Sequence, residues 1–217
     1  MTIHQNGHFN FDCQLCGECC TGAMRVQLNL YDLYKMAKHL KLSSTHSLFQ
    51  KGLVQLVEKD QRYWIPIIKF KKWTIPYCPF LVNSMDEQEV LHGICSLHPK
   101  DKPLICSMAP LGRIIDFQNQ SVEYCVTAPL EDCPGMGKKR ENNIQEILDF
   151  HEAELNYQFV YYQMLDSLPN WKASKEMYLG EIYSFTTVPS FDEVFTSIKN
   201  NLIHLTNQKS TPNNALQ

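Results

Sequence analysis

The chain lacks long apolar runs. No stretch of its 217 residues approaches the roughly 18 apolar residues that a membrane-spanning helix needs. Residues 1–10 are polar and contain no apolar segment of the kind that a secretory signal carries. These two absences lead us to expect a soluble, cytoplasmic protein with no membrane partner.

An excess of charge is also lacking, since 20 Lys and Arg residues against 23 Asp and Glu residues give a net charge of −3. This balance provides no general attraction to nucleic acid, and we expect no nucleic-acid partner. Two short basic clusters, at 69–72 and 138–140, are interpreted as solvated surface. The sequence shows no Ser-His-Asp pattern, no paired-carboxylate motif and no glycine-rich phosphate loop. It therefore predicts no particular reaction.

Cysteine is abundant, and four of the nine cysteines fall within eight residues: Cys13-Gln-Leu-Cys16-Gly-Glu-Cys19-Cys20. Cytoplasmic thiols stay mostly reduced, and an odd number cannot all pair within one chain, so a disulfide framework is disfavoured. A transient redox disulfide between Cys16 and Cys19 remains an alternative. The cluster predicts metal binding first, because packing does not require four thiols in one loop.

The spacing C-x2-C-x2-C lets three sulfurs converge on one metal centre, as in the loops of iron–sulfur ferredoxins, where a remote fourth cysteine often precedes proline. Cys78-Pro79 and Cys133-Pro134 are two such remote candidates. Zinc is the alternative, because it favours four cysteines or three cysteines and a histidine. His92 and His98 flank Cys95 and are candidates to complete a zinc site.

Two cysteines have open roles. Cys20 follows Cys19 directly, and adjacent cysteines rarely both bind one mononuclear site; a second metal, a bridge and a free thiol all remain open. Cys125 lies in a strand-like Tyr-Cys-Val setting and is equally consistent with a small packed hydrophobe. Nine thiols suffice for two four-ligand sites or for one site with supporting thiols.

Together these residues resemble the YkgJ-like cysteine-cluster family, described as zinc- or iron-chelating CxxCxxCC domains. The resemblance covers most of residues 1–137 and rests on six short segments: Phe11–Cys20, the helix start Leu28-Asn-Leu-Tyr-Asp32, Cys78-Pro-Phe-Leu81, Cys95-Ser-Leu-His98, Lys102-Pro103-Leu-Ile-Cys106 and Cys133-Pro-Gly-Met-Gly137. The family typically has Arg-Pro where this chain has Lys102-Pro103, and an arginine after the next cysteine, where this chain has Ser107.

The resemblance implies a cytoplasmic metal-binding protein. A related branch, the flagellin lysine N-methylases, shares the motif and depends on a [4Fe–4S] cluster, which makes that cluster our first choice of cofactor and zinc the second. We expect the metal ligands to come from eight cysteines: Cys13, Cys16, Cys19, Cys20, Cys78, Cys95, Cys106 and Cys133.

Three functions follow as hypotheses. The leading one is a metal-binding protein that holds an iron–sulfur cluster or zinc. The second is a cluster-dependent protein lysine methyltransferase that uses S-adenosylmethionine. The third is an interaction or assembly module that docks an unidentified protein partner through aromatic C-terminal helices.

The expected fold class is α+β, with a small loop-rich cysteine-cluster domain of short strands at 1–137, a helical extension packed on it at 138–206, and a disordered tail at 207–217. Cys78, Cys95 and Cys106 are expected in proline-containing loops. Glu152 and Glu154 are interpreted as the solvated face of a helix. The expected strands lie within 62–73, 111–117 and 121–126. The expected helices span 29–40, 44 to about 58, 142–165, 171–185 and a segment that begins at 190.

Overall fold

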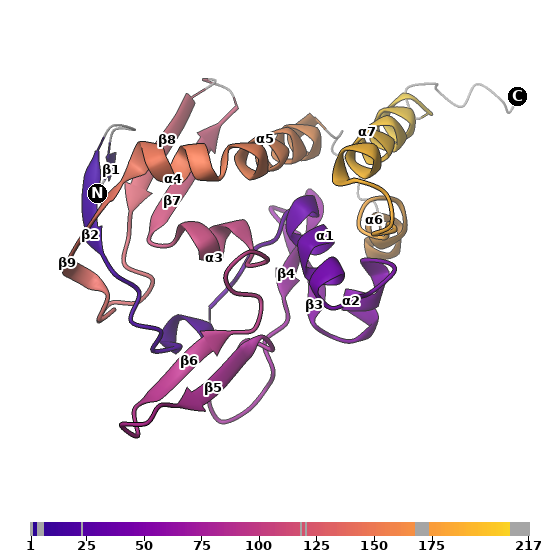
Figure 1. The fold of residues 1–217 in the computed structure, drawn as a ribbon. Coiled ribbons are helices and arrows are strands. Elements are labelled where there is room, and N and C mark those ends of the chain that lie inside the picture. Colours follow the sequence, from indigo (N-terminus) through magenta and orange to yellow (C-terminus); the bar gives the residue numbers. More distant parts are fainter. Residues whose placement is uncertain are drawn as a thin grey trace, which may run out of the picture.

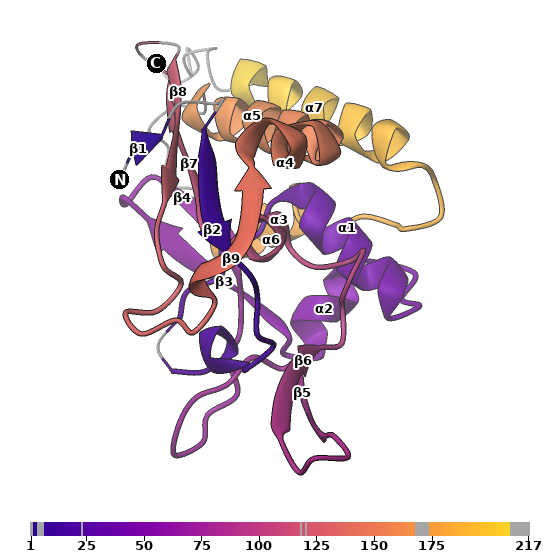
Figure 2. The ribbon, with the colours of Figure 1, turned by 60° about the vertical axis from the view of Figure 1, so that its left-hand side comes forward.

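The chain folds into an α+β structure in which small antiparallel strand pairs are covered by helices (Figure 1). The computed structural model describes residues 2–3, 7–22, 24–117, 119, 121–167 and 174–208. Helices α4, α5 and α7 cover one end of the molecule, and the hairpin formed by β5 and β6 projects at the opposite end (Figures 1 and 2). No helix in these ranges is long and apolar enough to cross a membrane.

The strands form four small sheets. A three-stranded sheet has the order β1-β8-β7, and the pairs β2-β9, β3-β4 and β5-β6 are all antiparallel. Strand β2 meets β9 across more than 120 residues of sequence, and this pairing brings the N-terminal segment beside the region that follows Cys133. The strands span Thr2–Ile3 (β1), His8–Phe11 (β2), Val54–Lys59 (β3), Tyr63–Ile68 (β4), Leu81–Met85 (β5), Leu91–Cys95 (β6), Leu111–Asp116 (β7), Ser121–Val126 (β8) and Met136–Asn143 (β9).

The helices connect and cover these sheets. Helix α1 has a capping box, in which Asn29 accepts from the backbone N–H of Asp32 and Asp32 accepts from that of Asn29. The helices span Leu30–His39 (α1), His46–Gln50 (α2), Leu104–Met108 (α3), Ile144–Phe150 (α4), Glu152–Ser167 (α5), Lys175–Glu181 (α6) and Phe191–Gln208 (α7), and a single 3₁₀ turn, η1, spans Glu18–Cys20.

Two hydrophobic clusters stabilise the fold. The main core cluster joins buried residues of 26–97 to residues of 161–202, and the fully buried Tyr161 and Tyr183 lie at its centre. The second core cluster joins Phe9, Leu104 and Tyr124 to the buried faces of α4 and α5. Each cluster contains residues from both sides of position 137, so residues that follow position 137 pack directly on those that precede it.

Several expected elements are confirmed. Helix α1 lies within the expected range 29–40, and β7 and β8 lie within the two ranges expected for them. Strand β4 lies within 62–73. It carries Pro66 and belongs to a two-stranded sheet, in which both strands are edge strands that tolerate proline. Helix α7 begins directly after Ser190.

Two expected helices are wrong in extent. The helix expected from position 44 to about 58 ends at Gln50, because Gly52 turns the chain with a φ of 67° and β3 then pairs with β4. The helix expected over 142–165 begins at Ile144, since Asn143 ends β9 and caps α4, and it is interrupted at His151, which separates α4 from α5.

The remaining expectations are met in part. Helix α6 is shorter than the range 171–185 expected for it, and residues 171–173 lie outside the described residues. Of the predicted tail, residues 207 and 208 are the last of α7, and 209–217 lie outside the described residues. Cys95 and Cys106 do not lie in loops: Cys95 ends β6, and Cys106 lies in α3 after Pro103, a position at a helix start where proline is tolerated.

Candidate metal centre

Backbone hydrogen bonds join the first cysteine segment to the second. The turn η1 holds Cys19 and Cys20 at the end of the CxxCxxCC loop. The N–H of Cys78 donates to the carbonyl of Cys20 at 2.7 Å, and the N–H of Gly22 donates to the carbonyl of Pro76, also at 2.7 Å. Segments separated by almost 60 residues are thereby fixed side by side.

The β5–β6 hairpin contacts the same loop. The N–H of Gly93 donates to the carbonyl of Leu15 at 2.6 Å, and a Cβ added at Gly93 would lie 2.4 Å from the Cα of Gly17. This approach therefore requires glycine at position 93. Within the hairpin, Cys95 pairs with Leu81. This strand pairing brings Cys95 beside the segment that carries Cys78.

Five thiols come together at this junction. Cys19 and Cys20 interact electrostatically with each other, and Cys20 interacts in the same way with Cys78 and Cys106. Cys95 interacts in the same way with Cys78 and Cys106. We call these residues the inner thiol group: Cys19, Cys20, Cys78, Cys95 and Cys106.

The inner thiol group lies against the main core cluster. Cys78 is buried within that cluster, and Cys20, Cys95 and Cys106 are half-buried and pack against it. Cys19 is exposed and forms the outer edge. Four segments of the chain therefore present sulfur atoms at the boundary between the core and the solvent.

The thiols differ in acidity. A hydrogen bond with Cys20 lowers the pKa of Cys19 to about 6, with burial opposing this shift and the Lys102 ammonium assisting it, and the same bond raises the pKa of Cys20 far above its ordinary value. Burial raises the pKa of Cys78 to about 11 and that of Cys106 to about 12. The pKa shift of Cys19 and the shifts of Cys78 and Cys106 therefore run in opposite directions.

All nine cysteines lie in the described residues, and none forms a disulfide. Within those residues, no three His, Cys, Asp or Glu side chains are arranged to hold a metal ion. The inner thiols are gathered by the backbone but do not form a coordination shell.

The other predicted ligands lie further out. Cys13 and Cys16 are exposed, and Cys16 forms an isolated parallel bridge with Gly93. Cys133 is half-buried; its segment lies beside the N-terminal segment, where the N–H of Asp12 donates to the carbonyl of Gly135. The contacts described for these three cysteines do not connect their thiols to the inner group.

Of the two cysteines with open roles, Cys20 belongs to the inner thiol group and Cys125 does not. Cys125, on β8, is half-buried against Gly112. His98 is exposed, and His92 binds the Asp86 carboxylate at 2.7 Å. The backbone N–H of His98 donates to the carbonyl of Cys95 at 2.9 Å, so the backbone of His98 lies beside a member of the inner thiol group.

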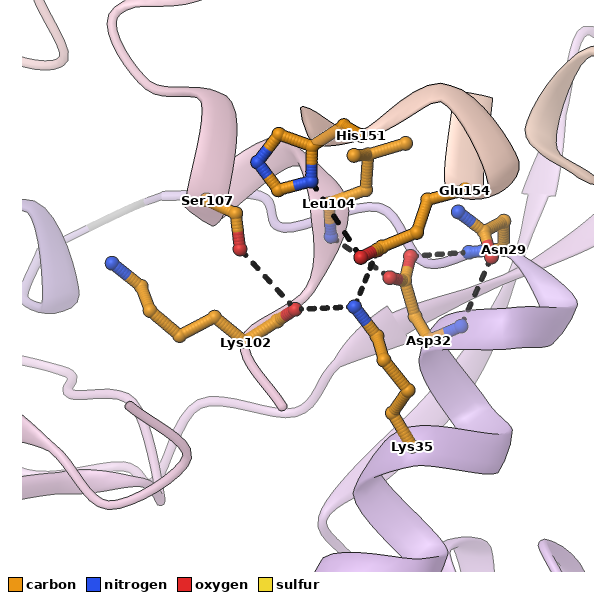
Figure 3. A network of polar contacts seen from close by, with 8 residues as sticks. All are labelled: Asn29, Asp32, Lys35, Lys102, Leu104, Ser107, His151 and Glu154. Carbon is orange, nitrogen blue, oxygen red and sulfur yellow. Dashed lines mark hydrogen bonds and ion pairs between the residues drawn. The ribbon is translucent and has the colours of Figure 1, made fainter. Parts of the chain in front are cut away.

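A buried polar network positions the helix that carries Cys106 (Figure 3). The carboxylate of Asp32, at the start of α1, accepts the backbone N–H of Leu104 at 2.8 Å, which fixes the first turn of α3. Lys35, one turn later on α1, donates to the carbonyl of Lys102 at 2.9 Å. Two side chains of α1 thus hold both ends of the turn that leads into Cys106.

Helix α5 completes this network. Glu154 forms an ion pair with Lys35, and its other carboxylate oxygen lies 3.5 Å from Nδ1 of His151 (Figure 3). Burial opposes charge on Glu154, but the His151 and Lys35 side chains beside it outweigh burial and lower its pKa. Burial raises the pKa of Asp32 to about 6, although Lys35 and two backbone N–H groups partly offset the shift.

The sequence interpretation missed this network. Glu154 was assigned to a solvated helix face, and that prediction is wrong, because its side chain is only 18% exposed and is paired with Lys35. The one available signal was the Asn29-x-x-Asp32 pattern, which indicates a capping box but not the second acceptor role of Asp32. The pairing of Lys35 with Glu154 spans 119 residues and has no local signature.

Comparisons with known proteins add no relative. No protein-family model matches the chain, and searches of curated proteins and of solved structures found no match.

Proposed function

We propose that this protein binds a metal centre through its inner thiol group. The observation that supports this is the convergence of Cys20, Cys78, Cys95 and Cys106, from four separate segments, at one edge of the main core cluster. Packing alone does not account for four half-buried or buried thiols, each of which interacts electrostatically with at least two of the others. Four thiolates are the complete ligand set of a structural zinc site or of a [4Fe–4S] cluster.

The proposed cofactor is a [4Fe–4S] cluster, with zinc as the alternative. We place the cluster before zinc because of the resemblance to the YkgJ-like family, and that resemblance is part of this proposal. A cytoplasmic location, where thiols stay reduced, is also part of it. Cys13, Cys16, Cys19 and Cys133 are sufficient for a second centre on the outer side of the first. The measured molar ratio of metal to protein therefore distinguishes a protein with one metal centre from a protein with two.

Lys102 supports the proposed site. Its ammonium group lowers the pKa values of both Cys19 and Cys106, though for Cys106 burial is the larger and opposing effect. A cation near several thiolates reduces their mutual repulsion before the metal arrives. Lysine thus supplies the charge at the position where the resembling family has arginine.

The test is anaerobic purification of the full chain, followed by elemental analysis for iron and zinc and assay of acid-labile sulfide. Iron and acid-labile sulfide in equal amounts are expected for the cluster. Zinc without sulfide would identify the alternative centre. Protein that contains neither metal, and takes up neither on anaerobic reconstitution, would contradict the proposal.

Cys78→Ser and Cys125→Ser form a matched pair for this test. Both remove one thiol that is shielded at least in part from solvent, but only Cys78 belongs to the inner thiol group. The metal content is expected to fall in Cys78→Ser and to stay unchanged in Cys125→Ser. Equal metal content in the two variants would exclude the inner thiol group as the ligand set.

A further inference from the structure

A hollow of about 610 Å³ lies on the surface next to the proposed metal centre. Two segments form it: the turn at 52–55, which leads into β3, and residues 69–77, which follow β4. The lining residues are Gly52, Gln55, Lys69, Phe70, Lys71, Lys72 and Tyr77. The volume falls within the range of about 300–1,000 Å³ that is typical of small-molecule sites.

Three lysines and no acidic residue line this hollow. Lys69, Lys71 and Lys72 form no ion pair with any residue in the described part of the chain. Three ammonium groups around one concavity repel one another, and a multiply charged anion relieves that repulsion. The electrostatics of the hollow therefore favour an anionic ligand.

Two aromatic residues add an apolar wall. Phe70 is half-buried and packs against the main core cluster, and the Lys71 ammonium lies 5.6 Å from the centre of the Tyr77 ring. The backbones of Lys71 and Tyr77 are hydrogen-bonded in both directions, at 2.8 and 3.2 Å, which holds the wall in place. A fixed apolar wall beside cationic groups suits a ligand that combines a flat ring with phosphate groups.

We propose that this hollow binds a phosphate-bearing small molecule of the nucleotide class. The juxtaposition of three unpaired lysines with Phe70 and Tyr77 carries the proposal, which does not depend on the metal. Tyr77 also forms a backbone bridge with Thr21 and precedes Cys78. The ligand therefore binds one residue away from the inner thiol group.

The experiment is titration calorimetry of the full chain with ADP and with inorganic pyrophosphate, at about 0.15 M salt, where distant surface charges are screened. Both probes are expected to bind, with ADP the tighter because its ring contacts the apolar wall. Absence of binding by both at millimolar concentration would overturn the proposal. So would binding of a single-stranded oligonucleotide without binding of ADP, because that would indicate a nucleic-acid surface.

Paired variants test the location. Lys69→Ser/Lys72→Ser is expected to weaken ADP binding about tenfold, since two of the three positive charges around the hollow are lost. Lys138→Ser/Lys139→Ser removes the same charge from exposed positions on β9 and is expected to leave the affinity unchanged. Lys69→Arg/Lys72→Arg is expected to retain binding. Equal losses in the two serine variants would indicate general charge attraction and would overturn the site.

Discussion

The backbone N–H of Cys78 lies 2.7 Å from the carbonyl oxygen of Cys20. This bond joins the end of the CxxCxxCC loop to the Cys78-Pro79 segment through the backbone alone. The polypeptide therefore brings two of the predicted ligand segments together by contacts that do not involve their thiols. Prior gathering of this kind reduces the entropy cost of binding.

Removal of the metal is expected to destabilise the protein. Because metal affinity contributes to folding free energy, chelation should lower the melting temperature of the wild-type chain by several degrees. Cys78→Ser should start from the lower value and show no further loss on chelation. Thermal unfolding with and without chelator measures both effects, and an equal drop in the two proteins would contradict the role of Cys78.

Gly93→Ala tests the contact between the hairpin and the loop. The new Cβ would lie 2.4 Å from the Cα of Gly17, so backbone must move, at a cost of about 1–3 kcal/mol in the free energy of unfolding. Metal content should fall as well, because Cys95 moves with the hairpin. Gly180→Ala is the control: nothing lies within 4 Å of its added Cβ, and alanine in α6 is expected to stabilise the helix by up to about 1 kcal/mol.

Lys35→Met tests the ion pair. It leaves the Glu154 carboxylate and the carbonyl of Lys102 without their buried donor, and we expect a loss of about 3 kcal/mol in the free energy of unfolding. The double variant Lys35→Met/Glu154→Gln should recover part of this loss, because no unpaired charge then remains. Denaturant unfolding of the two single variants and the double variant measures the coupling, and strictly additive losses would exclude the pair as a unit.

Asp32 predicts a pH dependence of stability. Its pKa is raised to about 6 by burial, above its ordinary value near 4, so the folded state binds the proton more tightly than the unfolded state. The cost of charging Asp32 is therefore fully present above pH 6 and disappears as the pH falls from about 6 to about 4. Relative to Asp32→Asn, the wild-type chain should gain up to about 3 kcal/mol over that window. Denaturant unfolding at several pH values checks this, and a constant difference would contradict it.

Sequence reasoning succeeded where the signal is local. The apolar spacing of α1, its cap at Asn29 and the alternation in β7 and β8 depend on neighbours within a few residues, so patterns in the chain were sufficient. It failed where distant pairing decides. Residues 54–58 read as helix in isolation, but β3 forms because β4 offers it a partner.

The candidate site shows the same division. The cysteine spacing alone indicated sulfur-rich chemistry, and the structure brings together Cys19, Cys20, Cys78, Cys95 and Cys106. The placement of the β5–β6 hairpin against the CxxCxxCC loop, and of β9 against β2, depends on pairing between distant segments, which no spacing rule encodes. The contribution of Asp32, Lys35 and Glu154 depends on helix packing and was equally invisible.

Helix α3 has only five residues, yet it touches both hydrophobic clusters. Leu104 and Met108 belong to the second core cluster, whereas Cys106 packs against the main one. A shift of the Cys106 sulfur would therefore displace α3, a helix that packs on both the main and the second core cluster. Oxidative damage at Cys106 would loosen both clusters together, and its effect would reach β7 and β8 as readily as the loops around the thiols.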